Sequence, residues 1–238
     1  MLSLRLEPEG ARIRYTPRAI AIVGFSGRDT AAVRAHIDEL ARHGVVAPQE
    51  TPALFLVSAD RLTQRPTVQV ASAHTSGEAE IVLLVVEGEV LVTLGSDHTD
   101  RQLEKHDITR SKQVCPKVIT SECWRLKDID KHWDRLIVRS WAGISKPLSP
   151  YQEGLASSLL SPEDVLAFVC SKTRLLEGLA VFCGTFPLLE QSFAFGPWFV
   201  ADITDPLTDR TLRLEYRTEY LGADFGAYSD QMAQPFQE

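Results

Sequence analysis

The chain has 238 residues, of which 44% are hydrophobic and 24% are charged, as is typical of a globular protein with a buried core. Its net charge of -7 argues against a nucleic-acid partner or an anionic membrane surface, because Lys and Arg drive binding to phosphates. The longest apolar run, Ile81 to Val86, is too short to span a bilayer, and residues 1–8 are too charged for a signal peptide, so we expect a cytoplasmic protein.

The first half of the sequence predicts mainly strands, with one helix. Residues 2–6 and 12–15 alternate apolar with polar residues, which predicts a hairpin around Pro8-Glu9-Gly10. Asp29 or Thr30 is expected to cap a helix that ends near Arg42. Glu87-Gly88-Glu89 is a plausible hairpin turn. The remaining strands expected here cover residues 19–23, 53–57, 81–86 and 90–94, with further strands from residue 68 onward.

The second half predicts two helices and further strands. We expect helices near residues 128–138 and 162–170, a strand over 178–183, and two strands within 192–220. The elements show no regular alternation of strand and helix. The pattern therefore predicts an α+β, β-rich fold that is mainly antiparallel, rather than a doubly wound sheet.

An acidic pair opens the most apolar strand. Glu78 and Glu80 lie two residues apart, so a strand would direct both carboxylates to the same face. Like charges held close together beside a dry core repel each other and lose hydration. A hard cation removes both penalties. Taken alone, so common a pair is better explained by two solvated glutamates at the end of a strand.

A polar turn follows the next predicted strand and contains Gly95-Ser96-Asp97-His98-Thr99-Asp100-Arg101. Asp97 is a candidate third carboxylate ligand, and Arg101 is a candidate for holding a substrate carboxylate through two hydrogen bonds. An ordinary polar turn would have a similar composition.

Together these segments resemble the fumarylacetoacetate hydrolase superfamily, in collinear order over about residues 20–220. That superfamily has, in order, an H-x-x-E segment, a D-x-E-x-E-L type strand, an N-D-x-T-x-R turn, a lysine segment, and R-Q-D-G and T-G-T-P stretches. The turn also looks like a branch known mainly as a domain of unknown function. The corresponding segments here are His36-Ile37-Asp38-Glu39, Glu78-Ala79-Glu80, Ser96 to Arg101, Ser111 to Pro116, Tyr151 to Gly154 and Val181 to Thr185.

The resemblance implies a β-roll of mixed sheets with a few peripheral helices, assembled as a homodimer. Residues 1–66 would form a small strand and helix region that acts as a lid. Residues 67–238 would form the metal-binding catalytic domain.

The resemblance also implies a metal-dependent hydrolase. Glu78, Glu80 and Asp97 would hold Mg²⁺ or Mn²⁺, with Ca²⁺ as a further possibility, and the metal would chelate a 2-oxo or 1,3-dioxo acid. A C–C bond would then be cleaved through a metal-bound enolate. The resemblance assigns catalytic roles to His36, Glu39 and Lys112, and substrate binding to His98, Arg101, Gln152 and Thr185.

Two alternatives remain open at this point. Relatives with the same kind of site support decarboxylation, isomerisation or hydration of a 2-oxo acid. A non-catalytic relative that only binds a small molecule is the second alternative. Three converging carboxylates argue against it, because they are costly to bury without a metal.

Overall fold

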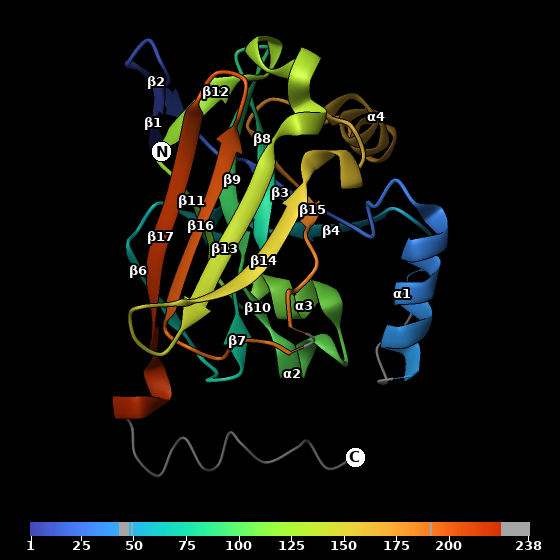
Figure 1. Cartoon of the computed structure of the whole chain (residues 1–238), viewed down its shortest axis with the longest axis vertical. Coiled ribbons are helices and arrows are strands. Elements are labelled where there is room, and N and C mark those ends of the chain that lie inside the picture. Colours follow the sequence, from blue (N-terminus) through green and yellow to red (C-terminus); the bar gives the residue numbers. More distant parts are fainter. Residues whose placement is uncertain (43–47, 49, 191, 225–238) are drawn as a thin grey trace.

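The computed structural model describes residues 1–42, 48, 50–190 and 192–224, without the side chains of residues 36, 39–42 and 223–224. In this part of the chain, two β-sheets pack together, and the helices lie around their edges (Figure 1). Antiparallel strand pairs outnumber parallel pairs among the described strands, as predicted.

The larger sheet has ten described strands, and its main path runs β2-β1-β12-β9-β8-β15-β3-β4, with β11 joined to β9 and β5. It joins segments that lie far apart in the sequence, since β3 and β15 pair in parallel. Its strands are β1 (Leu2–Leu6), β2 (Ala11–Tyr15), β3 (Ala19–Gly24), β4 (Ala53–Val57), β5 (Leu62–Thr63), β8 (Ala79–Val86), β9 (Glu89–Asp97), β11 (Lys117–Ile119), β12 (Glu122–Arg125) and β15 (Leu179–Thr185).

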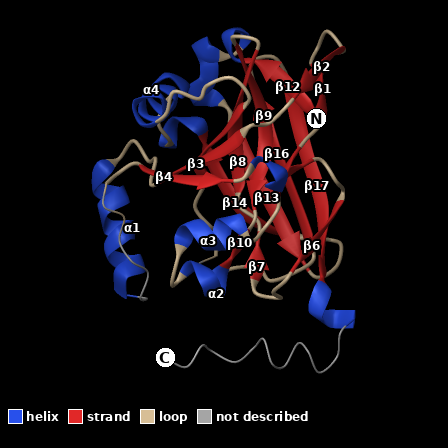
Figure 2. Ribbon diagram, turned by 180° about the vertical axis from the view of Figure 1, so that it is seen from behind, coloured by secondary structure: helices blue, strands red, loops and turns tan. Residues whose placement is uncertain are grey.

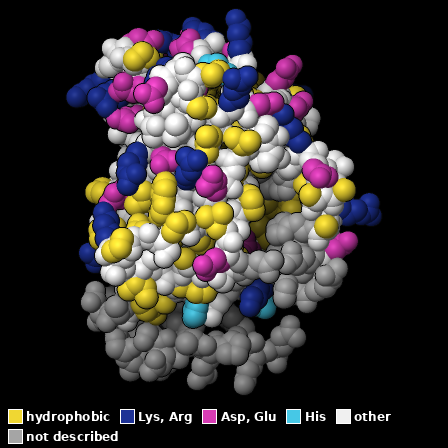
Figure 3. Space-filling model, in the orientation of Figure 1, with side chains coloured by type: hydrophobic (Ala, Val, Ile, Leu, Met, Phe, Trp, Pro, Cys, Tyr) yellow, Lys and Arg dark blue, Asp and Glu magenta, His cyan; other side chains and the backbone are white. Residues whose placement is uncertain are grey.

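The second sheet has five described strands in the order β14-β13-β16-β17-β6. Figure 3 shows many hydrophobic side chains on the face of the molecule that this sheet presents. Its strands are β6 (Thr67–Val70), β13 (Ile137–Gly143), β14 (Ser149–Leu155), β16 (Trp198–Asp205) and β17 (Arg210–Tyr220). A two-stranded ribbon pairs β7 (Thr75–Ser76) with β10 (Thr99–Asp100).

Both faces of the larger sheet are buried. One face packs on the five-stranded sheet, where Ile81 and Leu83 of β8 join Val138 and Ile203 in one core cluster. The other face carries a second cluster that includes Leu4, Ile20, Val82 and Leu84. Alternate residues of β8 thus enter different cores. This explains why β8 is a continuous apolar run rather than an alternating pattern.

Four α-helices are described, and two of them were not predicted. The expected helices are α1 (Thr30–Arg42) and α4 (Pro162–Lys172), and the Ser161 side chain caps α4 as predicted. The additional helices, α2 (Arg101–Glu104) and α3 (Ile108–Gln113), follow the polar turn after β9. Figure 2 shows α1 at the side of the molecule, near β4. No helix in the described ranges is both long and apolar enough to cross a membrane.

The helix predicted near residues 128–138 is wrong. Short 3-10 segments cover Leu126–Asp128 and Asp130–Arg135, and His132 interrupts the second with non-helical backbone angles. The chain then enters β13 at Ile137, where every second residue is buried and the backbone pairs with β14 and β16. The end of the predicted helix therefore belongs to a strand.

The β8–β9 hairpin sets the position of the candidate site. Glu87 and Gly88 both have positive φ, which suits a two-residue loop whose twist matches the strands, as the turn prediction requires. This loop fixes the register in which the start of β8 lies beside the end of β9.

The strands β3 and β4 share the sheet with β8 and β15, and the boundary predicted at residue 66 stays a prediction.

Candidate active site

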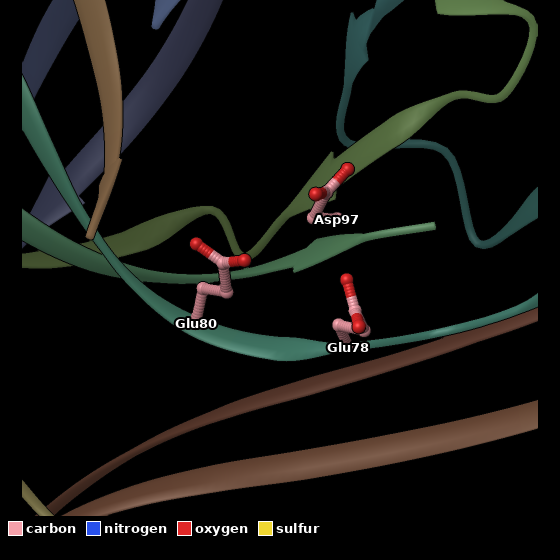
Figure 4. A group of neighbouring side chains, drawn as sticks. All are labelled: Glu78, Glu80 and Asp97. Carbon is pink, nitrogen blue, oxygen red and sulfur yellow. The ribbon is translucent and has the colours of Figure 1, made fainter. Parts of the chain in front are cut away.

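Three carboxylates converge where β8 begins and β9 ends. Glu78 precedes β8 and Glu80 lies on it, so both project to one side, while Asp97 is the last residue of β9. The Asp97 backbone N–H donates to the Glu78 carbonyl at 3.0 Å, which fixes this register. One oxygen from each carboxylate lies within 4.8 Å of the others, and Figure 4 shows the three neighbouring side chains on β8, β9 and the residue before β8. The two acidic segments thus meet in space.

Two buried lysines contact this group. The Lys112 Nζ contacts Asp97 Oδ2 and lies 3.5 Å from Glu78 Oε2. The Lys117 Nζ lies 3.2 Å from Asp97 Oδ1 and donates to three backbone carbonyls, including that of His98 at 2.7 Å. Lys117 is fully buried. Lys117 was not predicted as a site residue, because a lysine beside the apolar pair Val118-Ile119 cannot be told from a surface lysine in the sequence alone.

The lysines and the carboxylates change each other's proton affinity. Burial acts to raise the pKa of Asp97, but Lys112 and Lys117 outweigh burial and hold that pKa below its ordinary value. Burial also opposes the charge of Lys112, yet Asp97 and Glu78 raise its pKa. Burial lowers the pKa of Lys117 despite the contact with Asp97. At neutral pH, Asp97 and Lys112 therefore form a buried ion pair.

Glu80 has the opposite balance. Burial and the nearby charge of Asp97 raise its pKa well above the ordinary value, and the Gly184 N–H donates to its Oε2 at 2.8 Å. Asp97 Oδ1 is buried and makes no hydrogen bond among the described residues, although the Lys117 ammonium lies 3.2 Å away. Three crowded carboxylates, with the charge of Glu80 opposed by burial and by Asp97, fit a hard cation with oxygen ligands, such as Mg²⁺ or Mn²⁺.

The charges around the carboxylates nearly cancel. The group consists of four carboxylates and three cationic side chains, namely Glu78, Glu80, Asp97 and Glu104 with Arg101, Lys112 and Lys117. Fully ionised, it carries one negative charge. A divalent cation would make it singly positive, which is the charge that attracts a monoanionic acid.

Arg101 begins α2 and is 5% exposed. Its Nε donates to the Ser76 hydroxyl at 2.7 Å, its Nη1 donates to Glu104 at 2.8 Å, and its Nη2 lies 3.0 Å from Glu78 Oε1. The guanidinium also lies 4.2 Å from the centre of the Phe193 ring. These contacts hold Glu78 in place. Contact between Arg101 and a substrate carboxylate stays a prediction.

Gln152 and Thr185 join the two sheets next to the carboxylates. The Gln152 Oε1 accepts from the Ala79 N–H at 2.9 Å, and its Nε2 donates to Thr185 Oγ1 at 2.7 Å and to the Phe186 carbonyl at 2.8 Å. Thr185 follows an irregularity in the pairing of β15 with β8. Both residues line the cavity described next, and their substrate-binding role stays a prediction.

A cavity of about 640 Å³ opens beside the carboxylates. Glu78, Glu80 and Lys112 line it, and Asp97 is buried in contact with Lys112. The first turn of α1 lines another side through Ala32 and Val33. This volume is typical of a site for a small molecule.

A sequence profile described as protein of unknown function (DUF2848) matches residues 23–216, which is most of the chain. The chain belongs to the DUF2848 family. No curated protein matches its sequence.

Two solved structures resemble the fold of this DUF2848 protein. Cg1458 has a TM-score of 0.64 at 16% identity, over 87% of this chain and 77% of that chain. A 2-keto-3-deoxy-D-arabinonate dehydratase complexed with magnesium and 2,5-dioxopentanoate has a TM-score of 0.60 at 14% identity, over 86% of this chain and 74% of that chain. The predicted fold, a fumarylacetoacetate hydrolase-like β-roll with few helices, is confirmed.

The structure does not describe the side chains of the predicted general base, His36, and of its partner, Glu39. The backbone of His36 and Glu39 belongs to α1, but their side chains lie outside the described part of the DUF2848 protein. Their catalytic role stays a prediction.

His98 lies beneath the site rather than at its surface. It is 2% exposed, and its Nδ1 lies 2.7 Å from the Tyr216 hydroxyl, which also contacts the Ser96 hydroxyl at 2.9 Å. Burial lowers the pKa of His98 to about 3, helped by the charges of Lys117 and Arg101. The imidazole is therefore neutral at pH 7 and supports the segment that carries Asp97. The predicted contact between His98 and a substrate stays a prediction.

Acidification is expected to destabilise the wild-type protein more than a His98→Asn variant. The unfolded histidine has a pKa of roughly 6.5, so the unfolded state binds one more proton than the folded state between that value and about 3. The stability associated with neutral His98 is complete above pH 6.5 and is lost as the pH falls through this window, by at most about 1.4 kcal/mol per unit.

Urea unfolding at pH 7 and pH 4.5 measures this difference. Asparagine does not titrate in this range, so the two proteins share every other pH-dependent contribution. Equal losses of unfolding free energy in both proteins would mean that folded His98 takes up the proton.

Proposed function

We propose that this DUF2848 protein is a divalent-metal-dependent enzyme that acts on a 2-oxo or 1,3-dioxo acid. The observation that carries the proposal is the convergence of Glu78, Glu80 and Asp97 beside a cavity. The similar fold of a dehydratase that was solved with magnesium and 2,5-dioxopentanoate supports the same choice of metal and ligand class.

Glu78, Glu80 and Asp97 would hold Mg²⁺ or Mn²⁺, and an all-oxygen set also permits Ca²⁺. When bound, the cation would act as a Lewis acid toward the oxygens of the oxo acid. Lys112 contributes a permanent positive charge beside the cavity, because its pKa is raised, and would stabilise negative charge that develops on the substrate. Arg101 keeps Glu78 oriented.

The specific reaction that we propose is hydrolysis of a C–C bond. In a 2,4-dioxo acid, the oxygen of water bonds to C4 and the C3–C4 bond breaks. Its electron pair goes to C3, which takes up a proton. The products are a carboxylic acid and pyruvate. Following the resemblance in the sequence, His36 held by Glu39 would remove the proton from the attacking water.

Dehydration of a 2-oxo acid is the second candidate, favoured by the similarity to the dehydratase. Decarboxylation and isomerisation would use the same carboxylates and the same cationic surroundings. A purely binding role is less consistent with the site, because three carboxylates beside one another are costly to bury unless they serve a cation. A homodimer in the cytoplasm completes the proposal.

Product analysis tests the proposed reaction. Metal-depleted protein should be incubated with 2,4-dioxopentanoate, with and without MgCl₂, and followed by proton NMR. Hydrolysis predicts acetate and pyruvate in equal amounts, only with metal, and none from Asp97→Asn. Turnover that is equally fast in the presence of a chelator would remove the metal-dependent mechanism. A 2-oxo-3-deoxy sugar acid tests dehydration in parallel.

A further inference from the structure

The cavity next to the carboxylates has two chemically different parts. The charged part contains Glu78, Glu80, Arg101, Glu104 and Lys112. The apolar part, here called the apolar wall, consists of Ile22, Val33, Phe55, Ile108, Leu188 and Phe193, of which Phe193 borders Arg101 of the charged part. These six residues come from β3, α1, β4, α3 and the segment between β15 and β16. Five separate segments thus place apolar side chains around one space.

The apolar wall is closely packed where β3 meets β4. A Cβ atom at Gly24 would lie 2.7 Å from the Phe55 ring, and one at Gly27 would lie 2.8 Å from a Val33 methyl group. Any side chain at either position would displace the residue that it meets. The two glycines therefore allow Phe55 and Val33 to stand where they line the cavity.

Three of the polar side chains that line the cavity are already engaged within the protein. The Ser26 hydroxyl donates to the Cys183 carbonyl at 2.6 Å, and the Ser158 hydroxyl donates to the Leu155 carbonyl at 2.7 Å. The Gln152 amide uses both of its ends within the protein. A hydroxyl group of a ligand placed here would lose its hydrogen bonds to water without gaining hydrogen bonds to these side chains, which would weaken binding.

Arg28, a further cation that lines the cavity, is already paired with Asp134. Arg28 donates to the Leu159 carbonyl at 2.6 Å, and it also donates to both carboxylate oxygens of Asp134, at 3.0 Å and 2.5 Å. A second carboxylate on the ligand would have to displace Asp134 from this bidentate pair. The arrangement therefore disfavours a dicarboxylic ligand.

We infer that the substrate carries an uncharged apolar group, aryl or branched alkyl, on the side away from its oxo-acid head. This inference rests on the proposed function, because the charged part of the cavity would bind the head. The corresponding substrate class is a 2,4-dioxo acid whose acyl group is aryl or branched alkyl. Its hydrolysis would release the aryl or branched carboxylic acid together with pyruvate.

Three substrates with the same head test the inference: 4-phenyl-2,4-dioxobutanoate, 2,4-dioxopentanoate and 2,4-dioxohexanedioate. They end in a phenyl, a methyl and a carboxylate group, respectively. One buried methylene in an apolar pocket changes kcat/KM by about 10-fold or more. We therefore expect the phenyl compound to exceed each of the other two by at least about 10-fold in kcat/KM with Mg²⁺.

Phe55→Ala should lower kcat/KM for the phenyl compound by at least about 10-fold and change that for 2,4-dioxopentanoate by less than about threefold. Leu56→Ala is the matched control. Leu56 is the next residue on β4, is 57% exposed and does not line the cavity, so neither substrate should be affected. Phe55→Leu keeps an apolar side chain and should restore part of the preference if Phe55→Ala is poorly folded.

A preference for 2,4-dioxohexanedioate, or an equal loss for both substrates in Phe55→Ala, would overturn the inference. If no compound is turned over, the proposed hydrolysis fails, and calorimetry of the same three compounds with Mg²⁺-loaded protein then tests the inference alone. Binding of the phenyl compound at least about 10-fold tighter than the other two would still support the apolar group. Equal affinities would overturn it.

Discussion

Glu80→Gln is expected to abolish divalent-metal binding while leaving the metal-free protein at least as stable as wild type. Removing one of three carboxylate ligands should weaken binding of Mg²⁺ by more than about 100-fold, since even outer-shell changes cost 10-fold to 100-fold. Glu80 is 2% exposed, and the structure gives it no direct contact with Lys112 or Lys117. Loss of its charge therefore relieves repulsion from Asp97 and leaves no lysine unpaired.

Calorimetric titration of MgCl₂ and urea unfolding of the metal-free protein measure the two effects. Glu104→Gln is the matched control, because Glu104 lines the same cavity but lies outside the three converging carboxylates. It should retain one metal site per chain. Undiminished Mg²⁺ affinity in Glu80→Gln would place the metal elsewhere, and a large loss of stability would contradict the repulsion inferred at Glu80.

His36→Ala is expected to slow hydrolysis by about 100-fold to 10,000-fold, the usual contribution of a general base. In α1, residue 36 follows the cavity-lining residues Val33 and Ala32 by three and four positions, and this spacing places helix positions on one face. Mg²⁺ affinity should not change, because the three carboxylates belong to β8, β9 and the residue before β8. Steady-state turnover of 2,4-dioxopentanoate and calorimetry give the two values.

Arg34→Ala provides the control on the same helix. Arg34 is solvent-exposed and does not line the cavity, so its removal should leave turnover within about twofold. Turnover near the wild-type rate in His36→Ala would assign proton removal to another group or to water alone.

Local sequence signals predicted the β8–β9 hairpin and the strands at both ends of the chain, and the family resemblance added the meeting of the carboxylates. The turn at Glu87 and Gly88 fixes how β8 pairs with β9, and the period of two then determines which residues share a side. Glu78, Glu80 and Asp97 are therefore brought together by one hairpin whose features can all be read within 20 consecutive residues.

Features that depend on distant segments could not be read in this way. Residues 128–138 have a helical composition, but only short 3-10 segments form there before the chain enters β13 at Ile137, which pairs with β14 and β16. Lys117 looks like a surface lysine until β11 pairs with both β9 and β5 and buries it. The Arg101 contacts with Ser76 and Glu104, which restrain its orientation, likewise depend on how the turn after β9 folds onto β7.

The parallel pairing of β3 with β15 has a consequence for how the protein folds. Ala19 pairs with Leu179, so most of the polypeptide lies between the two residues. Likewise, β1 can pair with β12 only after the segment between them has been made. The chain must lose the entropy of closing this long loop before the stabilising contacts between the strands can form, and such topologies therefore fold slowly. During synthesis on the ribosome, β3 would emerge long before its partner and expose Ile20 and Ile22, which are buried in the finished sheet. The nascent chain should therefore be a substrate for chaperones until residues beyond β15 have left the exit tunnel.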